Sequence, residues 1–317
     1  MKPTRRVIPV VAGVIEDATG RILLAQRPPG KHLAGCWEFP GGKVDAGESE
    51  ADALVRELDE ELGLEVEVSS PLMTLCHHYS DRSIRLLLRR VDHWSGLPRG
   101  NEGQAIGWFR KDELAALDMP EADRPIVRLL GADPRYSISA SPDSFADTSE
   151  FLADWRARLE AGFRLLQLRA HDVPKPTLRI LAAECAALAR QFNARWLLNG
   201  HFDEAEALGA DGVHLSARVA LGLHSRPKGF SGLVGVSCHT QEALMHAAKI
   251  DADFACLSPV QATASHPGAA TLGWDRFAAW CAESPLPVVA LGGLSPNDLE
   301  RARECGAFGV AGIRGFR

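Results

Sequence analysis

Residues 42–64 read GKVDAGESEADALVRELDEELGL, and the spacing of their charged and apolar residues predicts one amphipathic helix that follows a glycine-containing loop. Ser49 is placed to cap the start of this helix, Asp52 stands three residues later in the capping-box position, and Gly63 is placed to end it. At about 100° per residue, one arc collects four apolar side chains. They are Leu54, Val55, Leu58 and Leu62.

Three carboxylates fall on a separate arc of the same helix, because Glu57, Glu60 and Glu61 are spaced at i, i+3 and i+4. Like charges at this spacing repel one another unless a cation neutralises them, and Mg²⁺ binds carboxylate and phosphate oxygens. A solvated acidic helix face is the simpler interpretation of such a run. The preceding Gly41-Gly42 loop and Arg56 favour metal-dependent phosphate chemistry instead.

The same stretch fits the pattern G-x5-E-x7-R-E-U-x-E-E-x-G-U (U, apolar) at every defined position, and this pattern is the signature of the Nudix hydrolases. Residues 1–131 are therefore identified as a Nudix domain with an α+β fold, a mixed sheet with flanking helices. Its expected strands are Val7–Val14, Arg21–Arg27, a strand near Glu65–Val68, Ser83–Val91 and one that begins at Trp108-Phe109.

Nearly the whole of this domain resembles the MutT branch, the 8-oxo-dGTP diphosphatases. The resemblance is carried by RILLAQR (21–27), WEFPGGK (37–43), NEGQ (101–104) and MPEADRP (119–125). It implies that water attacks a phosphorus atom of a nucleoside triphosphate and releases a monophosphate and pyrophosphate. The role would be to remove oxidised nucleotides before DNA replication and so to avoid mutation. Another nucleoside diphosphate derivative, such as a sugar nucleotide, is the alternative substrate.

The resemblance also implies a set of site residues. Mg²⁺, with Mn²⁺ as a substitute, would be held by the Gly41 carbonyl and by Glu57, Glu60, Glu61 and Glu102. Arg56 would brace these carboxylates, Glu48 would lock the loop to the helix, and either Glu57 or Glu102 would help to deprotonate the water. A bound metal lowers the pKa of water and screens the phosphate charge.

Substrate contacts are implied for six further residues, namely Arg27, Phe39, Gly42, Lys43, Arg82 and Asp123. Simpler roles are open for three of them: Phe39 as a core residue, and Arg27 and Arg82 as surface charges. Asp123 occupies the position where the bacterial enzymes carry an Asn that recognises the oxidised purine. An Asn both donates and accepts hydrogen bonds, whereas an ionised Asp only accepts. This departure is expected to broaden purine selection.

From Tyr136 onward the pattern changes to alternating strands and helices, which predicts a (β/α)8 TIM-type barrel. A glycine-containing turn recurs before several of the strands and is typical of a helix end. The eight expected strands are Tyr136–Ala140, Arg164–Arg169, Trp196–Asn199, Gly212–Leu215, Leu233–Cys238, Phe254–Pro259, Val288–Gly292 and Gly309–Ile313.

Residues 135–317 resemble thiamine-phosphate synthase and its TenI-like relatives, in QLR (167–169), ADGVHL (210–215), GVSCH (235–239), LSPV (257–260) and LGGLS (291–295). The acids and lysines that the synthase uses for Mg²⁺ and pyrophosphate are replaced at Ala170-His171, Gly200, Val219 and Ala264-Ser-His266, and Pro259 stands where the TenI-like relatives use a His. We therefore expect a degenerate synthase that binds a small phosphorylated ligand, with phosphate near Gly292, Gly293, Gly312 and Arg314. His214 and His239 are candidate strand-end groups.

Composition narrows the class of protein further. With 317 residues, 46% of them hydrophobic, and a net charge of −6, the chain is expected to be globular and to bind neither nucleic acid nor a membrane surface. Seven scattered cysteines and the lack of a signal or membrane-spanning segment favour a cytoplasmic protein. Two other functions stay open: a bifunctional thiamine-pathway enzyme, and a hydrolase controlled by a ligand-sensing barrel. Oligomeric state cannot be inferred.

Overall fold

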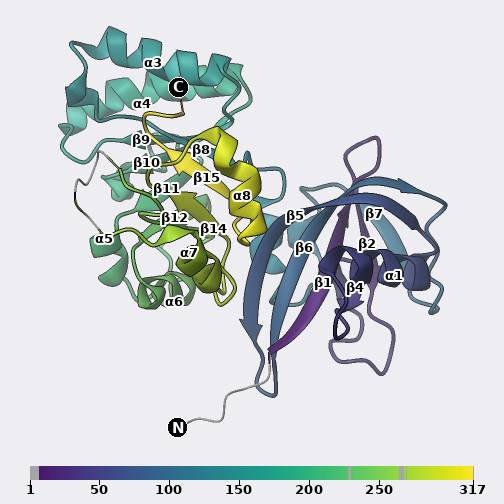
Figure 1. The fold of residues 1–317 in the computed structure, drawn as a ribbon. Coiled ribbons are helices and arrows are strands. Elements are labelled where there is room, and N and C mark those ends of the chain that lie inside the picture. The colour runs from purple at the N-terminus through teal and green to yellow at the C-terminus, as the bar shows by residue number, and fades with distance from the viewer. Residues whose placement is uncertain (1–6, 228–229, 264–267, 269, 317) are drawn as a thin grey trace. The chain divides into compact units, whose positions relative to one another are not determined.

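The computed structural model describes residues 7–227, 230–263, 268 and 270–316, and it divides into two compact units, Met1–Gly131 and Ala132–Arg317 (Figure 1). Within the described ranges, no helix combines the length and the apolar character needed to cross a lipid bilayer.

The first unit contains two small sheets. One sheet has the strand order β4-β1-β6-β5, in which β1 runs parallel to β6 and antiparallel to β4, and the other has the order β3-β2-β7. This is the α+β Nudix fold predicted from the sequence. The elements are β1 (Val7–Ile15), β2 (Ile22–Gln26), β3 (Trp37–Glu38), β4 (Gly41–Lys43), α1 (Glu50–Leu62), β5 (Glu65–His78), β6 (Ser83–Ser95), β7 (Ile106–Phe109), a 3-10 turn (Leu114–Ala116) and α2 (Arg124–Leu129).

Helix α1 begins and ends where its capping residues predict. The Ser49 side chain accepts a hydrogen bond from the Asp52 backbone at 3.1 Å, and Gly63 adopts φ 64° and ends the helix. The helix packs against β1, β4 and β5 of the same unit. Val55 shares the apolar arc with Leu54, Leu58 and Leu62 but is 40% exposed, because it lies at the edge of the buried face, which extends to Ala53 on its other side. The buried side chains of α1 are Ala53, Leu54, Leu58 and Leu62.

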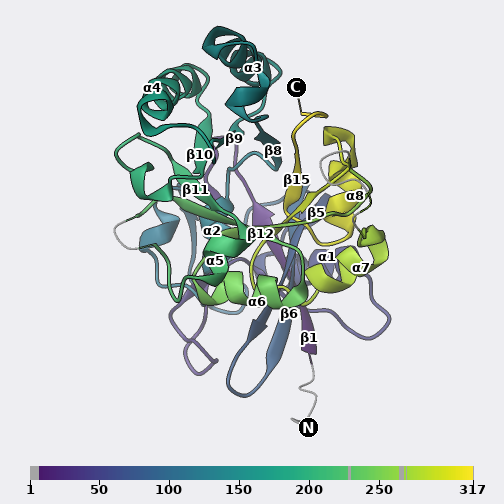
Figure 2. The same ribbon diagram turned by 90° about the vertical axis from the view of Figure 1, so that its left-hand side faces the viewer.

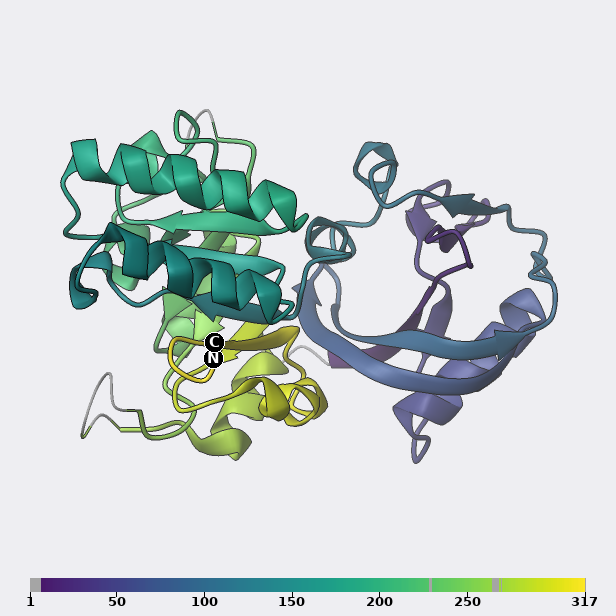
Figure 3. The same cartoon turned by 90° about the horizontal axis from the view of Figure 1, so that it is seen from above.

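Strands β5 and β6 form a long antiparallel hairpin whose curvature is visible in Figure 3. The predicted strand near Glu65–Val68 is only the first part of β5, which continues to His78. Pro71 interrupts the expected pattern because it has no N–H to donate, and a register shift between Pro71 and Met73 accommodates it.

The second unit is a closed barrel of eight parallel strands, in the order β10-β11-β12-β13-β14-β15-β8-β9 (Figure 2). The predicted TIM-type barrel is confirmed, and each of the eight predicted strands has its counterpart. The strands are β8 (Arg135–Ile138), β9 (Leu165–Arg169), β10 (Arg195–Asn199), β11 (Gly212–Leu215), β12 (Leu233–Cys238), β13 (Phe254–Leu257), β14 (Val288–Leu291) and β15 (Gly309–Gly312).

The barrel helices alternate with these strands, and their apolar faces join the strands in one continuous core. They are α3 (Thr148–Glu160), α4 (Lys175–Gln191), α5 (Ala217–Leu221), α6 (Gln241–Lys249), α7 (Gly273–Cys281) and α8 (Leu299–Glu304), with 3-10 turns at Pro142–Ser144, Phe202–Glu204 and Pro296–Asp298. The recurring turns before the strands have positive φ at Gly162, Gly209 and Gly306, as the helix-ending pattern predicts.

A buried arginine joins the end of the chain to the first barrel strand. Arg158 of α3 is fully buried, and its Nη1 donates hydrogen bonds to Ser137 Oγ, the Ile138 carbonyl and the Phe316 carbonyl at 2.9, 3.0 and 2.9 Å. Asp154 accepts from its Nε at 2.8 Å and balances the charge. This residue therefore fastens the seam where β15 meets β8.

Candidate active site

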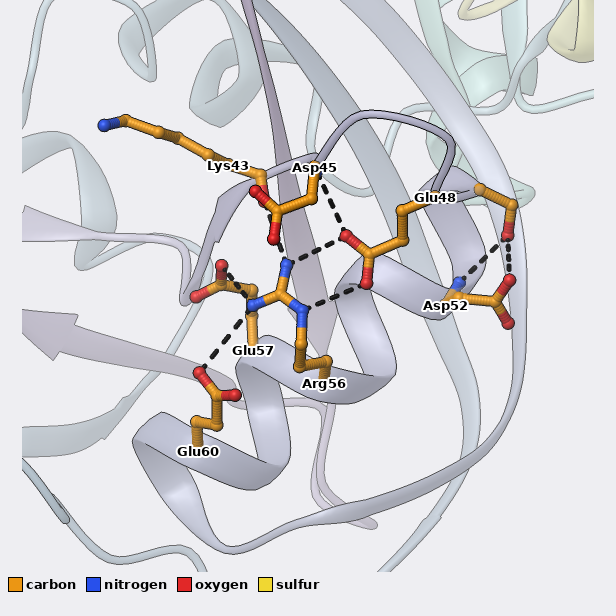
Figure 4. A network of polar contacts seen from close by, with 8 residues as sticks. Lys43, Asp45, Glu48, Asp52, Arg56, Glu57 and Glu60 are labelled. Carbon is orange, nitrogen blue, oxygen red and sulfur yellow. Dashed lines mark hydrogen bonds and ion pairs between the residues drawn. The ribbon is translucent and has the colours of Figure 1, made fainter.

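Arg56 lies at the centre of a network of polar contacts in the first unit (Figure 4). Its Nε and Nη2 donate to the two carboxylate oxygens of Glu48 at 3.0 and 2.9 Å, so that this pair is bidentate. Nη1 donates to Glu57 Oε1 at 2.8 Å, and Nη2 also donates to the Lys43 carbonyl at 3.1 Å. The hydrogen bonds to Glu48 and Glu57 raise the pKa of Arg56, and the bonds from Arg56 lower the pKa of Glu48.

The same network ties the loop before α1 to the helix. The Asp45 backbone N–H donates to Glu48 Oε2 at 3.1 Å, which holds the loop against the carboxylate that Arg56 grips. Figure 4 shows the Lys43 side chain extending away from the guanidinium, so that only its carbonyl takes part. The loop and the helix are thus held in one fixed arrangement by a single guanidinium.

A pocket of about 530 Å³ opens beside this network. It is lined by residues from β1, β2, β3, β4, α1 and β6, by the loops that follow β2, β3, β5 and β6, and by the segment before α2. Ten of the predicted metal and substrate residues line it: Arg27, Phe39, Gly41, Gly42, Lys43, Glu57, Glu61, Arg82, Glu102 and Asp123. The pocket therefore brings together segments that are almost 100 residues apart in the sequence.

Carboxylates crowd one part of the pocket. Burial and the nearby charges of Glu57, Glu38 and Glu102 together raise the pKa of Glu61 to about 7, although the hydrogen bond from the Gly41 N–H at 3.3 Å lowers it. Lys31 donates to Glu102 at 2.6 Å, and this bond raises the pKa of Lys31. In the described ranges, no three acidic, histidine or cysteine side chains are already grouped closely enough to hold an ion. The donors are all oxygens with an excess of negative charge, a set that fits a hard divalent cation.

Glu60 is the one predicted metal ligand that does not line the pocket. Its side chain is 64% exposed and lies 3.7 Å from Arg56 Nη1, on the outer side of the network. The helical spacing that brings Glu57 and Glu61 to the pocket therefore leaves Glu60 at its edge.

A second set of charged residues lines the same pocket, and of these Asp123 is buried whereas Arg27 and Glu38 are partly buried. Arg27 pairs with Glu38 and also donates to the His32 carbonyl at 2.6 Å. Asp123 is buried, and burial together with the charge of Glu38 raises the pKa of its carboxyl well above the usual range. A neutral Asp123 carboxyl has both a donor and an acceptor, as an Asn side chain does.

Phe39 and Arg82 also line this pocket. Phe39 is 4% exposed, as a core residue would be, yet it also lines the pocket. Arg82 lies 3.5 Å from Asp81 and reaches the pocket from the loop between β5 and β6.

Two of the lining residues that were not predicted, Glu38 and Tyr79, are titratable and lie beside the predicted ones. Glu38 stands inside the quoted WEFPGGK stretch, and the pairing of Ala25 with Glu38 across β2 and β3 places it beside Arg27. The sequence offers one indication of this role, because Glu38 is a charged residue directly before the apolar Phe39. Tyr79, whose pKa burial raises to about 12, lies at the end of the β5 hairpin, and no local pattern marks it.

The barrel holds a second cavity, of about 1010 Å³, at the carboxyl ends of its strands. The predicted phosphate residues Gly292, Gly293, Gly312 and Arg314 all line it. Gly292 and Gly293 also have a packing role, because a Cβ at these positions would lie 2.8 Å from Pro259 and 2.4 Å from the Ala262 carbonyl.

The candidate histidines of the barrel both line this cavity. His214 is 2% exposed, whereas His239 is exposed and contacts the Ser258 carbonyl through Nδ1 at 3.0 Å. Among the described lining residues there is no Asp or Glu, which agrees with the replaced acids noted in the sequence. The replaced lysine segment at 264–266 lies outside the described residues.

The fold and the two cavities define a two-domain chain with a carboxylate-rich pocket in an α+β domain and a cation-lined cavity in a TIM-type barrel. Residues 11–129 match the family described as NUDIX domain, and residues 136–316 match the family described as thiamine monophosphate synthase.

Three relatives illustrate the match. The first domain is 36% identical to the 8-oxo-dGTP diphosphatase of Escherichia coli (strain K12), a match that covers 38% of this chain and 94% of that protein. It is 42% identical to the CTP pyrophosphohydrolase of the same organism, over 38% of this chain and 90% of that protein. The barrel is 35% identical to the thiamine-phosphate synthase of Thermus thermophilus, over 49% of this chain and 76% of that protein.

The chain belongs to the Nudix family through its first domain and to the thiamine monophosphate synthase family through its second. Both resemblances found in the sequence, and their fusion in one chain, are thereby confirmed. The first domain is a pyrophosphohydrolase of the Nudix class.

Proposed function

We propose that the first domain hydrolyses a nucleoside triphosphate to the monophosphate and pyrophosphate, with 8-oxo-dGTP as the preferred substrate. One observation carries this proposal: a single pocket joins the carboxylates Glu57, Glu61 and Glu102 to the partly buried Arg27 and Glu38 and to the buried Asp123. The first group suits a metal-bound triphosphate, and the second suits a polar heterocycle.

Mg²⁺ would be held by the Gly41 carbonyl, Glu57, Glu61 and Glu102, with Glu60 reaching it from the edge of the pocket, and Mn²⁺ would substitute. The bound ion would lower the pKa of water and screen the phosphate charge. Arg56 holds Glu57 in place through the 2.8 Å hydrogen bond, and Glu48 holds Arg56. Either Glu57 or Glu102 would take a proton from the water.

The hydrogen-bonding groups proposed to bind the base suit a purine whose edge is altered by oxidation. A protonated Asp123 can accept from one edge atom and donate to another, which preserves the hydrogen-bonding capacity of the Asn that it replaces. CTP is the second candidate substrate, because the similarity to the CTP pyrophosphohydrolase is no weaker than that to the 8-oxo-dGTP diphosphatase.

Initial rates with 8-oxo-dGTP, dGTP, CTP and ADP-ribose test this choice. We expect Mg²⁺-dependent turnover, abolished by EDTA, that is fastest for 8-oxo-dGTP. A ratio of oxidised to normal dGTP near one would refute the role in cleansing the nucleotide pool, and faster hydrolysis of CTP would assign the second candidate.

A mutation-rate assay extends the test to cells that lack their own oxidised-nucleotide hydrolase. The intact chain should suppress A·T to C·G errors, and the Glu60→Gln variant should fail to do so. Equal suppression by both proteins would remove Glu60 from the proposed metal ligands.

Two roles for the barrel are alternatives. Formation of thiamine phosphate would make the chain bifunctional, and the carboxylate-free lining of the described cavity counts against it; complementation of a thiamine auxotroph would establish it. In the other role, the barrel senses a ligand and controls the hydrolase. Hydrolase rates that do not respond to thiazole phosphate or any other thiamine precursor would exclude this role.

A further inference from the structure

An ion pair joins two of the loops that line the pocket of the first domain. Lys31 Nζ, from the loop between β2 and β3, donates to Glu102 Oε2, from the loop between β6 and β7, at 2.6 Å. Both residues line the pocket, although 71 positions separate them in the sequence. Glu102 is one of the predicted metal ligands, so a cation of the protein itself holds an oxygen that the proposed Mg²⁺ site requires.

The loop that carries Glu102 is held in place without Lys31. The Glu102 N–H donates to Gln104 Oε1 at 2.8 Å, and Gln104 Nε2 donates to the Glu61 carbonyl at 3.0 Å. The Asn101 N–H donates to the same carbonyl at 3.0 Å. This acceptor belongs to the last turn of α1, where carbonyls have no partner within the helix. The loop is therefore fastened to the end of α1, and Lys31 is not needed to position it.

The contact of Lys31 with Glu102 is one that can be exchanged. The two side chains are 52% and 46% exposed, and an ion pair with this exposure contributes little to stability. The loop turns at Gly30, which has φ 87°, and its base is closed by the hydrogen bond from the Gly35 N–H to the Arg27 carbonyl at 2.9 Å. Because the ammonium stands at the end of a flexible four-carbon side chain, it can leave the carboxylate while the base of the loop stays as it is.

The charge of Lys31 acts on more than one predicted metal ligand. The hydrogen bond to Glu102 and the charges of Glu102 and Glu61 raise the pKa of Lys31, so its side chain is an ammonium at neutral pH. A divalent cation on these carboxylates would compete with the ammonium for Glu102 and would also repel it. The phosphate chain of a nucleotide would then offer Lys31 a new anionic partner in the same pocket, and lysine is a common phosphate ligand.

We propose that Lys31 is an exchangeable counter-ion of the active site, which holds Glu102 until a divalent cation takes this carboxylate and then binds the phosphate chain of the nucleotide. This role rests on the proposed function and extends it to a residue outside the predicted metal and base contacts. Removal of the lysine should therefore tighten the binding of the metal and weaken the binding of the nucleotide. A lysine that only oriented Glu102 would have the opposite effect on the metal.

Calorimetry on the full chain with Mn²⁺ and no nucleotide tests the competition for Glu102. We expect Lys31→Met to bind Mn²⁺ about fivefold more tightly than the parent chain, and we expect this gain to disappear when Glu102→Gln is also present. Lys111→Met is the matched control and should leave the affinity unchanged, because Lys111 pairs with Glu16 at 3.0 Å in an exposed ion pair that does not line the pocket. Equal or weaker Mn²⁺ binding by Lys31→Met would overturn the proposal.

Steady-state kinetics at saturating Mg²⁺ test the contact with phosphate, with the nucleotide that the parent chain hydrolyses fastest. We expect Lys31→Met to raise KM about tenfold, with a much smaller change in kcat. Lys31→Arg keeps the positive charge and should keep the KM of the parent chain. An unchanged KM in Lys31→Met, or a loss confined to kcat, contradicts the assignment.

The Mn²⁺ titration also separates a failure of this role from a failure of the proposed function. If the parent chain binds no Mn²⁺, the metal site and the role of Lys31 are both refuted. If the parent chain and Lys31→Met bind Mn²⁺ equally and hydrolyse the nucleotide with the same KM, only the role of Lys31 is refuted.

Discussion

Arg56 and Glu48 are joined by two parallel hydrogen bonds of 3.0 and 2.9 Å, and this bidentate pair connects the loop before α1 to the helix that carries Glu57. The pair does not line the pocket. The pair therefore contributes to hydrolysis by holding in place the carboxylates that do line the pocket.

Glu48→Gln tests this support. The amide keeps the shape of the carboxylate but cannot accept two hydrogen bonds from the guanidinium, so that Arg56 and then Glu57 lose their fixed positions. We expect kcat/KM for the nucleotide to fall about 10- to 100-fold, as for other residues that orient metal ligands. Steady-state kinetics measure the effect, with Glu67→Gln in β5 as the exposed control. Full activity of Glu48→Gln would show that the pair is dispensable.

Gly42→Ala tests how closely the loop must approach the helix. A Cβ at this position would lie 2.2 Å from Glu57 Oε2, so that the carboxylate has to move. Overpacking of this kind costs about 1–3 kcal/mol in stability. A displaced carboxylate would lower kcat by about 100-fold. Thermal unfolding and initial rates give both numbers, and Gly222→Ala, whose nearest new contact is 3.4 Å, should be neutral.

Asp123→Asn tests the protonation of the buried carboxyl. A raised pKa in the folded state means that the native protein binds this proton more tightly than the unfolded chain, so stability falls as pH rises above the ordinary pKa of Asp, about 3.9. An Asn side chain has no proton to release in this range, so the Asp123→Asn variant should not lose stability in this way. We expect it to be more stable than the parent at pH 7 and equally stable near pH 3, with urea unfolding as the measurement.

The same variant reports on specificity. If Asp123 acts as a neutral donor and acceptor, Asn should maintain the preference for 8-oxo-dGTP over dGTP, and Asp123→Ala should lose it. A preference that appears only in the Asn variant would indicate that the native carboxyl is ionised.

His214 gives a pH dependence of the opposite sign. Its pKa falls from 6.5 to about 3 on folding, so the unfolded chain takes up a proton in this range that the native barrel does not. Stability should decline as pH falls from 6.5 toward 3, by up to roughly 1.4 kcal/mol per pH unit. His214→Gln should remove this component, whereas His224→Gln, an exposed residue of the same unit, should not.

Local patterns were sufficient for most of the fold. Helix α1 depends on its own caps and period, and the barrel strands are short apolar runs between glycine turns, so both could be predicted from the sequence. The second half of β5 could not, because Pro71 argues against a strand unless the register shifts beside it, as it does between Pro71 and Met73, and such a shift depends on the pairing with β6. The exposure of Val55 could not be predicted, because the apolar arc of a helix does not by itself show which of its two edges the neighbouring strands cover.

The candidate site shows the same division. Helical spacing was enough to bring Glu57 and Glu61 to one wall, since both lie on α1. Glu38, by contrast, joins Arg27 and Asp123 through strand pairing and the return of a distant loop. No short segment of the sequence predicts that Glu38 lies near Arg27 and Asp123, or that the pKa of Asp123 is raised.

The seam held by Arg158 has a practical consequence for protein engineering. Trimming the chain before Ile313 would remove two carbonyl acceptors, those of Ile313 and Phe316, from a guanidinium that has no access to water. Such a truncated protein would lack the hydrogen bonds that hold β15 against β8. An affinity tag is therefore better attached at the N-terminus.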